Sequence, residues 1–586
     1  MDARLLGAEL QQLPPCLEEL ELECVEAESC LLVSDDGCGL TMPKVKFITS
    51  HRDHDSTSSP SVRMWPIAGK FPLLKTLVLR TSQPSIPVGE FAHLPSSLTR
   101  FGLVAPRQKD SELCELVRLL PRHLQSLELW ADFHFSDAFF QNLPPTLVEL
   151  AIPGSFDRTA LSASHIGMLP RTITSISKPM HISPLFLERV PPLLREITVR
   201  SIDIDPDSSS ISSSDFSSIW FRFLPRHLTY LDLSEDKLVN GSSNLVLADL
   251  PPTITALAIP ILNWSVQTSP SPQFPPLLST FDCDNCELWT EDQWKLLPHN
   301  GALKTLTLAS STSDLDVPFI RLALVPRSVT SLKWDFNVSE DEKLVDVFGE
   351  ALESLVLMYP ISPSIIPLLP RGLKQTSLAF NRAITLKEAK QWPNGLQMVC
   401  ITLGEPTLMD QSLLPIFSFP PSLTDLSIKN LSVEVTRQAF AQLSRNLKCL
   451  FVEQTSGGIS HGQDFSALPP RLTAMRWAGT PLPPTCLEYL PSTLTNLNLY
   501  MEGIQDEHMQ HLPAELRLLI YERHSQLTSK CIPFLPPHLK FIFNTGSSDL
   551  NSRLVQRREE VDANLETPDP RVIQRLSGIS LARSKQ

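Results

Sequence analysis

The sequence predicts an α/β solenoid, in which a strand and its return segment are repeated and stacked so that a parallel sheet lines the inside. The main observation is a pattern that recurs along the chain: an apolar residue, a proline, two variable residues and Leu-x-x-Leu-x-Leu, as in 120–129 and 224–233. Successive copies begin mostly 21–27 residues apart, which is a repeat period. Proline is abundant, at 52 of 586 residues, whereas glycine is scarce, at 21. Proline therefore has one structural role that is used many times.

Most of the prolines involved mark the entry into a strand. In 17 of 21 copies a proline stands three residues before the first leucine, and an apolar residue precedes that proline every time. Proline disfavours helix at the residue before it and donates no backbone hydrogen bond. It is therefore expected to end each return segment and to direct the chain into the next strand.

The leucines of the motif predict the strand and its orientation. The last two apolar positions of Leu-x-x-Leu-x-Leu alternate with period two, so they face a core while the residues between them face out. One such strand cannot bury its apolar side alone, and the copies must therefore stack in parallel. The gap of 57 residues between Leu17 and Leu74 divides at Val45, which gives about 22 units.

Several of the segments between predicted strands begin with polar residues and end with apolar ones. They open with Ser, Thr or Asp, often followed by acidic residues, which is the chemistry of a helix N-terminus. The sequence therefore predicts short helices on the return path. The clearest of these segments are 136–143, 290–297, 436–443 and 506–512.

The period and the motif resemble those of the leucine-rich-repeat family, over about residues 13–545. The resemblance implies a curved horseshoe with a parallel concave sheet and short helices or irregular segments on the convex side. The proline-containing variant is similar to repeats of secreted bacterial effectors and of intracellular eukaryotic proteins, F-box proteins among them. The family usually has Asn or Cys three residues after the last leucine, and here few copies fit, Asn381 and Cys286 among them. Another polar group is therefore expected to satisfy the turn backbone.

The ends and two inserts lie outside the repeat. Residues 1–12 form a short N-terminal segment, and residues 546–586 form a tail with a short helix near 553–564 followed by disorder. Ser-rich stretches at 55–61 and 207–218 are interpreted as loops between units, either as plain insertions or as phosphorylation sites.

The composition limits which kinds of partner and which cellular compartment we expect for this protein. The net charge of −14 argues against general binding of nucleic acid or of anionic membrane. No apolar run reaches the ~18 residues that a membrane span needs, and the N-terminus lacks the apolar core of a signal peptide. The 11 cysteines lack the spacing of a disulfide framework. The sequence thus predicts reduced thiols and a location in the cytoplasm or nucleus.

The search for chemistry predicts no catalytic, cofactor or metal site. The pair Cys283 and Cys286 would need two further ligands for zinc, and both fall on repeat positions, so they are interpreted as structural. The polar cluster at 51–54 lacks metal-ligand spacing. Walker, Gly-x-Ser-x-Gly and Gly-x-Gly-x-x-Gly motifs are all missing. We therefore expect a protein that is not an enzyme and has no small-molecule substrate.

The exposed concave face is the remaining candidate site. It consists of the residues two, four and six positions after each first leucine, and in the first unit these are three glutamates. Aromatic residues and arginines on such a face are typical anchors of protein interfaces, although any single one can equally be a solvated strand residue. The candidates for partner contact are Glu19, Glu21, Glu23, Glu128, Trp130, Tyr230, Asp232, Asp282, Lys333, Asp335, Lys429, Arg476 and Tyr500.

These observations predict a non-catalytic scaffold that binds a partner protein along the concave face. The acidic first unit and the net charge favour a partner with a basic patch. Two alternatives stay open from the resemblance. One is the substrate-recognition subunit of a ubiquitin ligase, although residues 1–12 do not contain the helical F-box that such subunits carry before their repeats. The other is a regulator of a small GTPase, which would need an exposed Arg or Asn at a rim loop.

Overall fold

The computed structural model divides the chain into two compact units, Met1–Leu303 (unit 1) and Lys304–Gln586 (unit 2). The first twelve residues, both Ser-rich stretches, the cluster at 51–54 and the tail at 546–586 lie outside the residues that the structure describes. The described residues are 19–25, 31–35, 44–50, 72–81, 88–104, 110–130, 135–152, 160–161, 163–177, 181–182, 190–198, 224–233, 250–259, 274–284, 286, 289, 291–309, 323–336, 348–404, 418–432, 434–455, 459, 461–501, 503–522, 528–537, 539 and 541–544.

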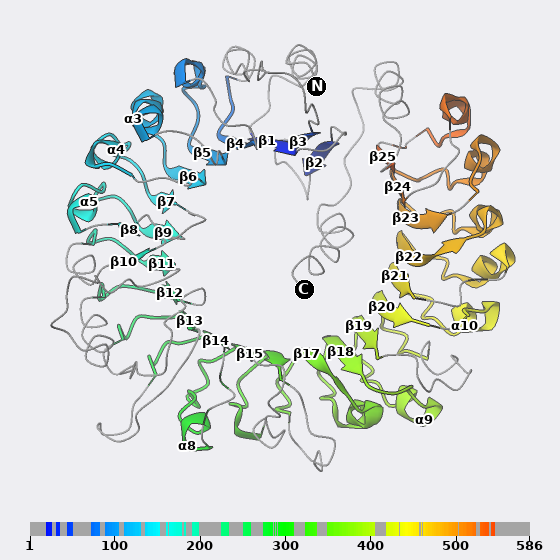
Figure 1. Cartoon of the computed structure of the whole chain (residues 1–586). Coiled ribbons are helices and arrows are strands. Elements are labelled where there is room, and N and C mark those ends of the chain that lie inside the picture. Colours follow the sequence, from blue (N-terminus) through cyan, green and yellow to red (C-terminus); the bar gives the residue numbers. More distant parts are fainter. Residues whose placement is uncertain are drawn as a thin grey trace. The chain divides into compact units, whose positions relative to one another are not determined.

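Unit 1 contains a row of short parallel strands, one for nearly every repeat (Figure 1). From β4 to β14 the strands of the row pair in chain order, β4–β5–β6–β7–β9–β11–β12–β13–β14, and β8 and β10 form a separate parallel pair. The strands are β1 (Glu19–Val25), β2 (Leu31–Asp35), β3 (Lys44–Ser50), β4 (Thr76–Thr81), β5 (Arg100–Val104), β6 (Ser126–Trp130), β7 (Glu149–Ala151), β8 (Ala160–Leu161), β9 (Ser175–Ser177), β10 (His181–Ile182), β11 (Glu196–Thr198), β12 (Tyr230–Asp232), β13 (Ala256–Ile259) and β14 (Thr280–Asp284).

Unit 2 repeats this arrangement without interruption, since each strand from β15 to β25 pairs in parallel with the next one along the chain. Its strands are β15 (Thr305–Ala309), β16 (Ser331–Asp335), β17 (Ser354–Ile361), β18 (Gln375–Phe380), β19 (Met398–Leu403), β20 (Asp425–Leu431), β21 (Cys449–Gln454), β22 (Ala474–Leu482), β23 (Asn496–Met501), β24 (Leu518–Glu522) and β25 (Phe541–Asn544).

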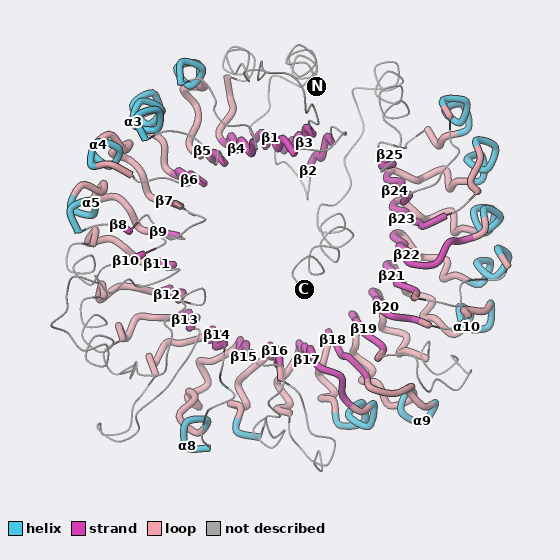
Figure 2. Tube along the Cα trace, viewed as in Figure 1, coloured by secondary structure: helices cyan, strands magenta, loops and turns pink. Residues whose placement is uncertain are grey.

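Short helices lie on the return paths, and within each unit they form the side away from the strands (Figure 2). All four segments predicted to be helical contain a helix, as α4, α8, α10 and η10. Ser136 and Thr436 occupy the N-cap positions of α4 and α10, yet neither side chain caps its helix. The helices are η1 (Val88–His93), α3 (Asp110–Leu119), α4 (Asp137–Gln141), α5 (Ala163–Gly167), α8 (Glu291–Trp294), η6 (Pro363–Leu368), α9 (Leu386–Ala389), α10 (Arg437–Ala441), η8 (Gly462–Ala467), η9 (Pro484–Tyr489), η10 (Asp506–His511) and η11 (Ser529–Phe534).

The N-terminal strands depart from the expected sequential stacking. The strand predicted around Val45 exists as β3, but it pairs with β1 on the side opposite to β4, so β1 lies directly beside β4. The segment between β1 and β3 contains β2, which runs antiparallel to β3 and takes the place of a return path. A hairpin strand of this kind occupies a sheet edge with backbone hydrogen bonds and needs no stacked copy.

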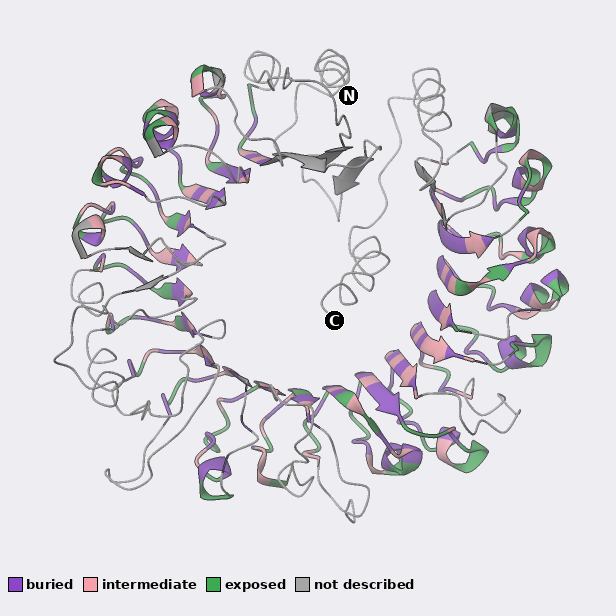
Figure 3. Ribbon diagram, viewed as in Figure 1, coloured by how far each residue is buried: buried purple, intermediate pink, exposed green. Residues whose placement is uncertain are grey.

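The core of each unit is built from the leucine positions of the motif (Figure 3). In the copy of the motif that begins at Leu124, the residues Leu124, Leu127 and Leu129 are fully buried. Glu128, between the last two, is half-buried. The same alternation of buried and less buried residues runs through β13, β15, β16 and β19. The predicted alternation of inward and outward residues is therefore confirmed in these strands.

The proline turn has a defined hydrogen bond in nearly every copy. The carbonyl oxygen of the proline accepts the N–H of the first leucine, as in Leu124 to Pro121 at 3.0 Å. The two residues after that leucine then donate their N–H groups to one carbonyl of the preceding copy. Thr99 and Arg100, for example, donate to Lys75 O at 2.8 and 2.9 Å. Each copy is thus joined to its neighbour before the strand itself begins.

Serine and threonine hydroxyls beside the first leucine add a second set of bonds between copies, which we call the hydroxyl ladder. Thr253, immediately before Ile254, donates to the carbonyls of Arg226 and Leu228, both at 2.8 Å. The residues whose hydroxyls make such bonds to the preceding copy are Ser97, Thr99, Thr146, Thr172, Thr174, Thr229, Thr253, Thr255, Ser279, Thr330, Ser422, Thr424, Thr473, Thr493 and Thr495.

The hydroxyl ladder lies before the strand, whereas the Asn or Cys position of the family lies after it. At that later position Leu431 is fully buried, Asn381 is exposed, and Cys286 donates a weak bond to Cys283 O at 3.6 Å. The hydroxyl ladder therefore joins the copies at the other end of the strand, and the expectation of another polar group at the later turn stays a prediction. With repeated parallel strands, leucine cores and helical return paths, both units have the leucine-rich-repeat solenoid fold.

Replacing Thr253 by valine tests the hydroxyl ladder. Valine has nearly the same shape but cannot donate, so two carbonyls lose a partner. We expect the free energy of unfolding to fall by about 1 kcal/mol. Chemical denaturation and hydrogen exchange of residues 224–259 measure the loss. Thr253→Ser keeps the hydroxyl and should retain most of the stability. Equal losses for serine and valine would assign the effect to the missing methyl group.

Candidate concave interface

The concave face of unit 1 has a strong excess of acidic side chains. At the positions two and four residues after each first leucine, the described strands β5–β14 present five carboxylates and one arginine. That arginine, Arg100, forms an ion pair with Glu128 at 3.8 Å. The five carboxylates, which we call the acidic face, are Glu128, Glu149, Glu196, Asp232 and Asp282.

Tyr230 lies within this surface, beside Glu196 in the register of β11 and β12. Its side chain is only partly exposed, at 36%, and its hydroxyl donates to Asp232 Oδ2 at 3.1 Å. Burial of the phenol, followed by the charge and hydrogen bond of Asp232, raises the pKa of Tyr230 to about 12. The phenol is therefore a neutral donor at physiological pH, with an apolar ring that remains available to a partner.

The concave face of unit 2 has mixed charge. Lys333 is exposed, and its neighbour Asp335 is half-buried. Burial raises the pKa of Asp335, and the charge of Lys333 opposes that shift. The other candidates in this unit, Lys429, Arg476 and Tyr500, are also half-buried. Positive and negative groups alternate here, so this face has no net preference for a charged partner.

The predicted candidates are divided between the two units. Asp232 and Asp282 share the acidic face with Tyr230 and Glu128, while the candidates on β16–β23 belong to unit 2. Backbone positions place Glu19, Glu21 and Glu23 on β1, but their side chains, like that of Trp130, lie outside the described residues. All thirteen candidates stay predictions as partner contacts.

Sequence reasoning missed Glu149 and Glu196 in the acidic face, although both occupy the second position after a first leucine. It also missed an apolar part of the unit 2 face. Cys449, Phe451, Ala474 and Leu518 are at most 9% exposed, with Ile520 packed against them, although all five occupy outward positions. The signal was present in the sequence as apolar residues at positions that are polar in most other copies. We call these five residues the apolar patch.

The described residues contain no group of three or more His, Cys, Asp or Glu side chains that could hold a metal ion. Cys283 and Cys286 are fully buried in the core and are not joined in a disulfide, and both stand at repeat positions. Burial raises the pKa of the Cys486 thiol to about 12, so this thiol stays neutral. Of the helices that the structure describes, none is long and apolar enough to span a bilayer.

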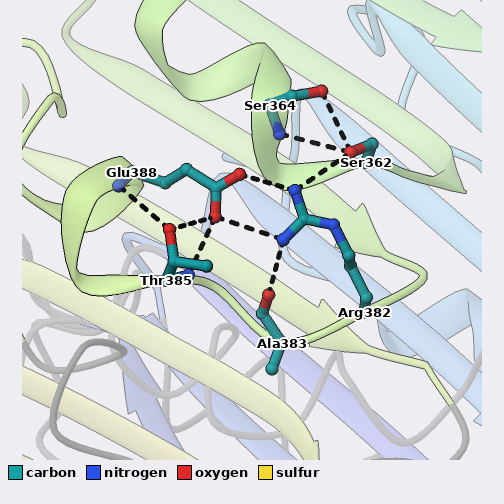
Figure 4. A network of polar contacts seen from close by, with 6 residues as sticks. All are labelled: Ser362, Ser364, Arg382, Ala383, Thr385 and Glu388. Carbon is teal, nitrogen blue, oxygen red and sulfur yellow. Dashed lines mark hydrogen bonds and ion pairs between the residues drawn. The ribbon is translucent and has the colours of Figure 1, made fainter.

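A rim loop after β18 contains an exposed arginine that is held in place (Figure 4). Arg382 donates to both carboxylate oxygens of Glu388, at 2.6 and 3.2 Å, and to Ser362 Oγ at 3.3 Å. Thr385 and Glu388 form a reciprocal capping box at the start of α9. Its bonds are Thr385 N–H to Glu388 Oε2 at 2.8 Å and Glu388 N–H to Thr385 Oγ1 at 3.3 Å. The guanidinium therefore stabilises the loop between β18 and α9.

This network predicts a local dependence on acid. Burial alone would raise the pKa of Glu388, but the hydrogen bonds from Arg382 and Thr385 outweigh burial and hold its pKa below the usual value. A carboxyl with a lowered folded pKa contributes stability above its unfolded pKa and loses it as pH falls through the folded pKa. We therefore expect hydrogen-exchange protection of residues 382–390 to fall below about pH 4. Glu388→Gln should remove this step, and a step that persists in that variant would contradict the assignment.

This chain matches a number of solved structures, CroV588 and TLR13 among them. Over 82% of this chain and 74% of the other, the chain matches the crystal structure of CroV588, described as a novel circular leucine-rich-repeat protein, with 18% identity and a TM-score of 0.42. It matches TLR13 in complex with the RNA ssRNA13 over 83% and 84% of the chains, with 16% identity and a TM-score of 0.45. Neither a protein-family model nor a curated protein matches the sequence. With both TM-scores below 0.5, the fold assignment rests on the repeats and strand register of this chain.

Proposed function

We propose that this protein is a non-catalytic scaffold that binds a partner protein, and that the acidic face of unit 1 receives a basic patch of that partner. The observation that carries the proposal is the charge of this face: five carboxylates on five of the seven strands from β6 to β14, with one arginine that is already paired with Glu128. An interface built on repeated strands can be long, because each copy adds a strand to the same surface.

The dimensions fit a macromolecular partner. The row from β6 to β14 contains seven neighbouring strands, five of which carry a carboxylate, and at ~4.8 Å between strands the row spans about 29 Å. The carboxylates at the two ends are thus further apart than one Debye length, so they act as a spread field that steers a basic surface. Tyr230 supplies an aromatic contact in the same surface.

Charge reversal of two of these carboxylates tests the proposal. Affinity capture from a lysate with wild-type protein is compared with Asp232→Lys/Asp282→Lys. We expect at least a tenfold loss of the captured partner, and binding of the wild type should weaken as salt rises. Asp425→Lys/Glu453→Lys makes the same change of net charge on the unit 2 face and should capture normally. An unchanged set of partners for the acidic-face variant would overturn the proposal.

The two alternative roles gain no support from the described residues. A GTPase regulator needs an exposed Arg or Asn at a rim loop that can reach a phosphate, and the arginine of the rim loop described above, Arg382, is bonded to Glu388 and Ser362 instead. A role in substrate recognition for a ubiquitin ligase would use the same binding surfaces, and it would appear as co-capture of ligase subunits. The prediction that nucleic acid is not a partner rests on the net charge alone. The predicted intracellular location rests on the sequence alone.

A further inference from the structure

The turns that lead into the strands of unit 1 carry basic residues and no acidic ones. In the eight copies whose strands form the row from β5 to β14, two residues stand between the proline and the first leucine. These positions contain three arginines and two histidines, and neither Asp nor Glu. The turns thus differ from the acidic face on the strands of the same copies, and they do so in a chain of net charge −14. The three arginines, which we call the arginine row, are Arg122, Arg171 and Arg226.

The arginine row alternates with proline. At the position directly after the proline of the motif, the five copies from β6 to β12 carry, in order, Arg122, Pro145, Arg171, Pro192 and Arg226, and all five residues are exposed. Neighbouring strands lie ~4.8 Å apart, so successive arginines stand about 9.6 Å apart with one exposed proline ring between them. The turns therefore present positive charge at a fixed interval.

Bonds between copies hold the backbone of the row at the spacing of the strands. The carbonyl oxygen of Arg122 accepts the hydroxyl of Thr146 in the next copy at 2.9 Å. The carbonyl oxygen of Arg226 accepts the hydroxyl of Thr253 in the same way, at 2.8 Å. Because the backbone is fixed before a partner arrives, binding to the row does not require these turns to be ordered first.

The guanidinium groups of the row are available to a partner. Within the part of the chain that the structure describes, the side chains of Arg122, Arg171 and Arg226 make no ion pair and no hydrogen bond. Arg382 differs from them, because its guanidinium is bonded to Glu388. A guanidinium group can bind a carboxylate through two parallel N–H bonds. The row therefore suits a partner that carries carboxylates at a matching interval.

The interval selects the conformation of that partner. A polyproline II helix has three residues per turn and rises ~3.1 Å per residue, so acidic residues at every third position face one side, about 9.3 Å apart. An α-helix with acidic residues at every seventh position runs about 21 Å over two intervals, whereas the row covers about 19 Å. In a β-strand, every third residue alternates between the two faces. The two residues between the acids would lie over Pro145 and Pro192, which favours apolar residues there.

A nucleic acid fits the row less well. One strand of a duplex carries a phosphate about every 3.4 Å, so most phosphates would face a proline or a gap between arginines. The same turn positions contain no Phe, Tyr or Trp on which unpaired bases could stack. The interval and the alternation with proline both favour a peptide.

We propose that the arginine row binds an acidic, proline-rich segment of a partner protein in the polyproline II conformation, with a carboxylate at every third residue. The site goes beyond the proposed function, since it lies on the turns, takes the opposite charge and uses none of the carboxylates of the acidic face. Unit 1 thus has two binding surfaces of opposite charge, one before the strands and one on them.

A pair of synthetic peptides tests the interval. The probe consists of five Glu-Pro-Pro triplets, and the control has the same composition with its five glutamates in one run followed by ten prolines. Fluorescence anisotropy with the full chain measures both affinities. We expect the triplet peptide to bind at least tenfold more tightly than the control, and its binding to weaken as salt rises. Equal affinities, or no binding of the triplet peptide up to about 1 mM, would overturn the proposal.

Substitutions locate the binding site of the triplet peptide. Arg122→Ser/Arg226→Ser removes the two outer charges of the row and should lower the affinity at least tenfold. Arg371→Ser/Arg445→Ser removes two exposed arginines from the same turn position in unit 2 and should leave the affinity unchanged. All four side chains are exposed, so we expect both variants to fold. Equal losses in the two variants would show that the peptide responds to net charge, and would overturn the proposal.

Two further measurements separate this site from other surfaces and other ligands. The acidic-face variant Asp232→Lys/Asp282→Lys should bind the triplet peptide at least as tightly as the wild type, whatever its effect on the partner captured by the acidic face. A loss of peptide binding in that variant would overturn the proposal. Tighter binding of a thymidine 15-mer or of phosphatidylserine vesicles than of the triplet peptide would assign the row to phosphate groups, and would also overturn it.

Discussion

Replacing Trp334 by alanine is expected to lower the free energy of unfolding by about 3–5 kcal/mol. Trp334 is fully buried on β16, at an inward position of the repeat, and its ring centroid lies 4.9 Å from that of Phe336. Alanine would leave a large cavity between stacked copies that are held mainly by their shared core. Because each copy contacts only its neighbours, the loss should be concentrated in β15–β17.

The adjacent residue provides a matched control for this substitution. Lys333 is exposed on the other face of the same strand, so Lys333→Ala should change stability by less than about 0.5 kcal/mol. Denaturant midpoints measure the total effect, and hydrogen exchange of residues 305–309, 331–335 and 354–361 locates it. Similar losses for the two variants would mean that the inward and outward assignment of β16 is wrong.

Gly479→Ala is the second substitution with a large expected effect, of at least about 3 kcal/mol. Gly479 has φ +101°, a conformation that residues with a side chain rarely adopt. An added Cβ atom would also collide with the carbonyl oxygen of Gln454 on the preceding strand. Because that obstacle is backbone, it cannot move aside without breaking the pairing of β21 and β22.

Gly503 separates the two contributions to this cost. Its φ is +71°, but an added Cβ would meet open space. Gly503→Ala should therefore cost only the conformational term, about 1–2 kcal/mol. Thermal or denaturant unfolding of both variants gives the comparison. Equal costs would show that the contact with Gln454 relaxes freely.

Most of the fold could be predicted because the same strand-and-return motif recurs along the chain. The leucine positions fixed which side chains face the core, and Leu124, Leu127 and Leu129 illustrate the outcome. The order of β3 and β1 could not be predicted, since a hairpin and a regular copy use similar short apolar runs and differ only in their long-range pairing. The hydroxyl ladder also escaped the sequence analysis, because Ser and Thr are common at turns for several other reasons.

The sequence predicted which positions of each strand belong to the candidate interface. It predicted only some of the residues that make up the acidic face and the apolar patch. Alternation along each strand identified the outward positions, so Tyr230, Asp232 and Asp282 were placed on one surface correctly. Their association with Glu149 and Glu196 depended on following every copy through the chain. The apolar patch required burial, which a single sequence does not contain, because Phe451 at an outward position is equally compatible with a solvated surface and with a covered one.

The bonds between copies have a consequence for how this protein can change over time. Thr229 and Thr495 make the same hydroxyl bond to the preceding copy, at 3.2 and 3.1 Å, although their partners Arg195 and Thr473 are 34 and 22 residues away. The length of the return segment between two strands therefore does not change how those strands pair. Evolution can lengthen one outer loop, or an engineer can graft a peptide into it, while every strand keeps its alignment. The outer segments can thus vary in sequence and length while the pairing of the strands stays the same.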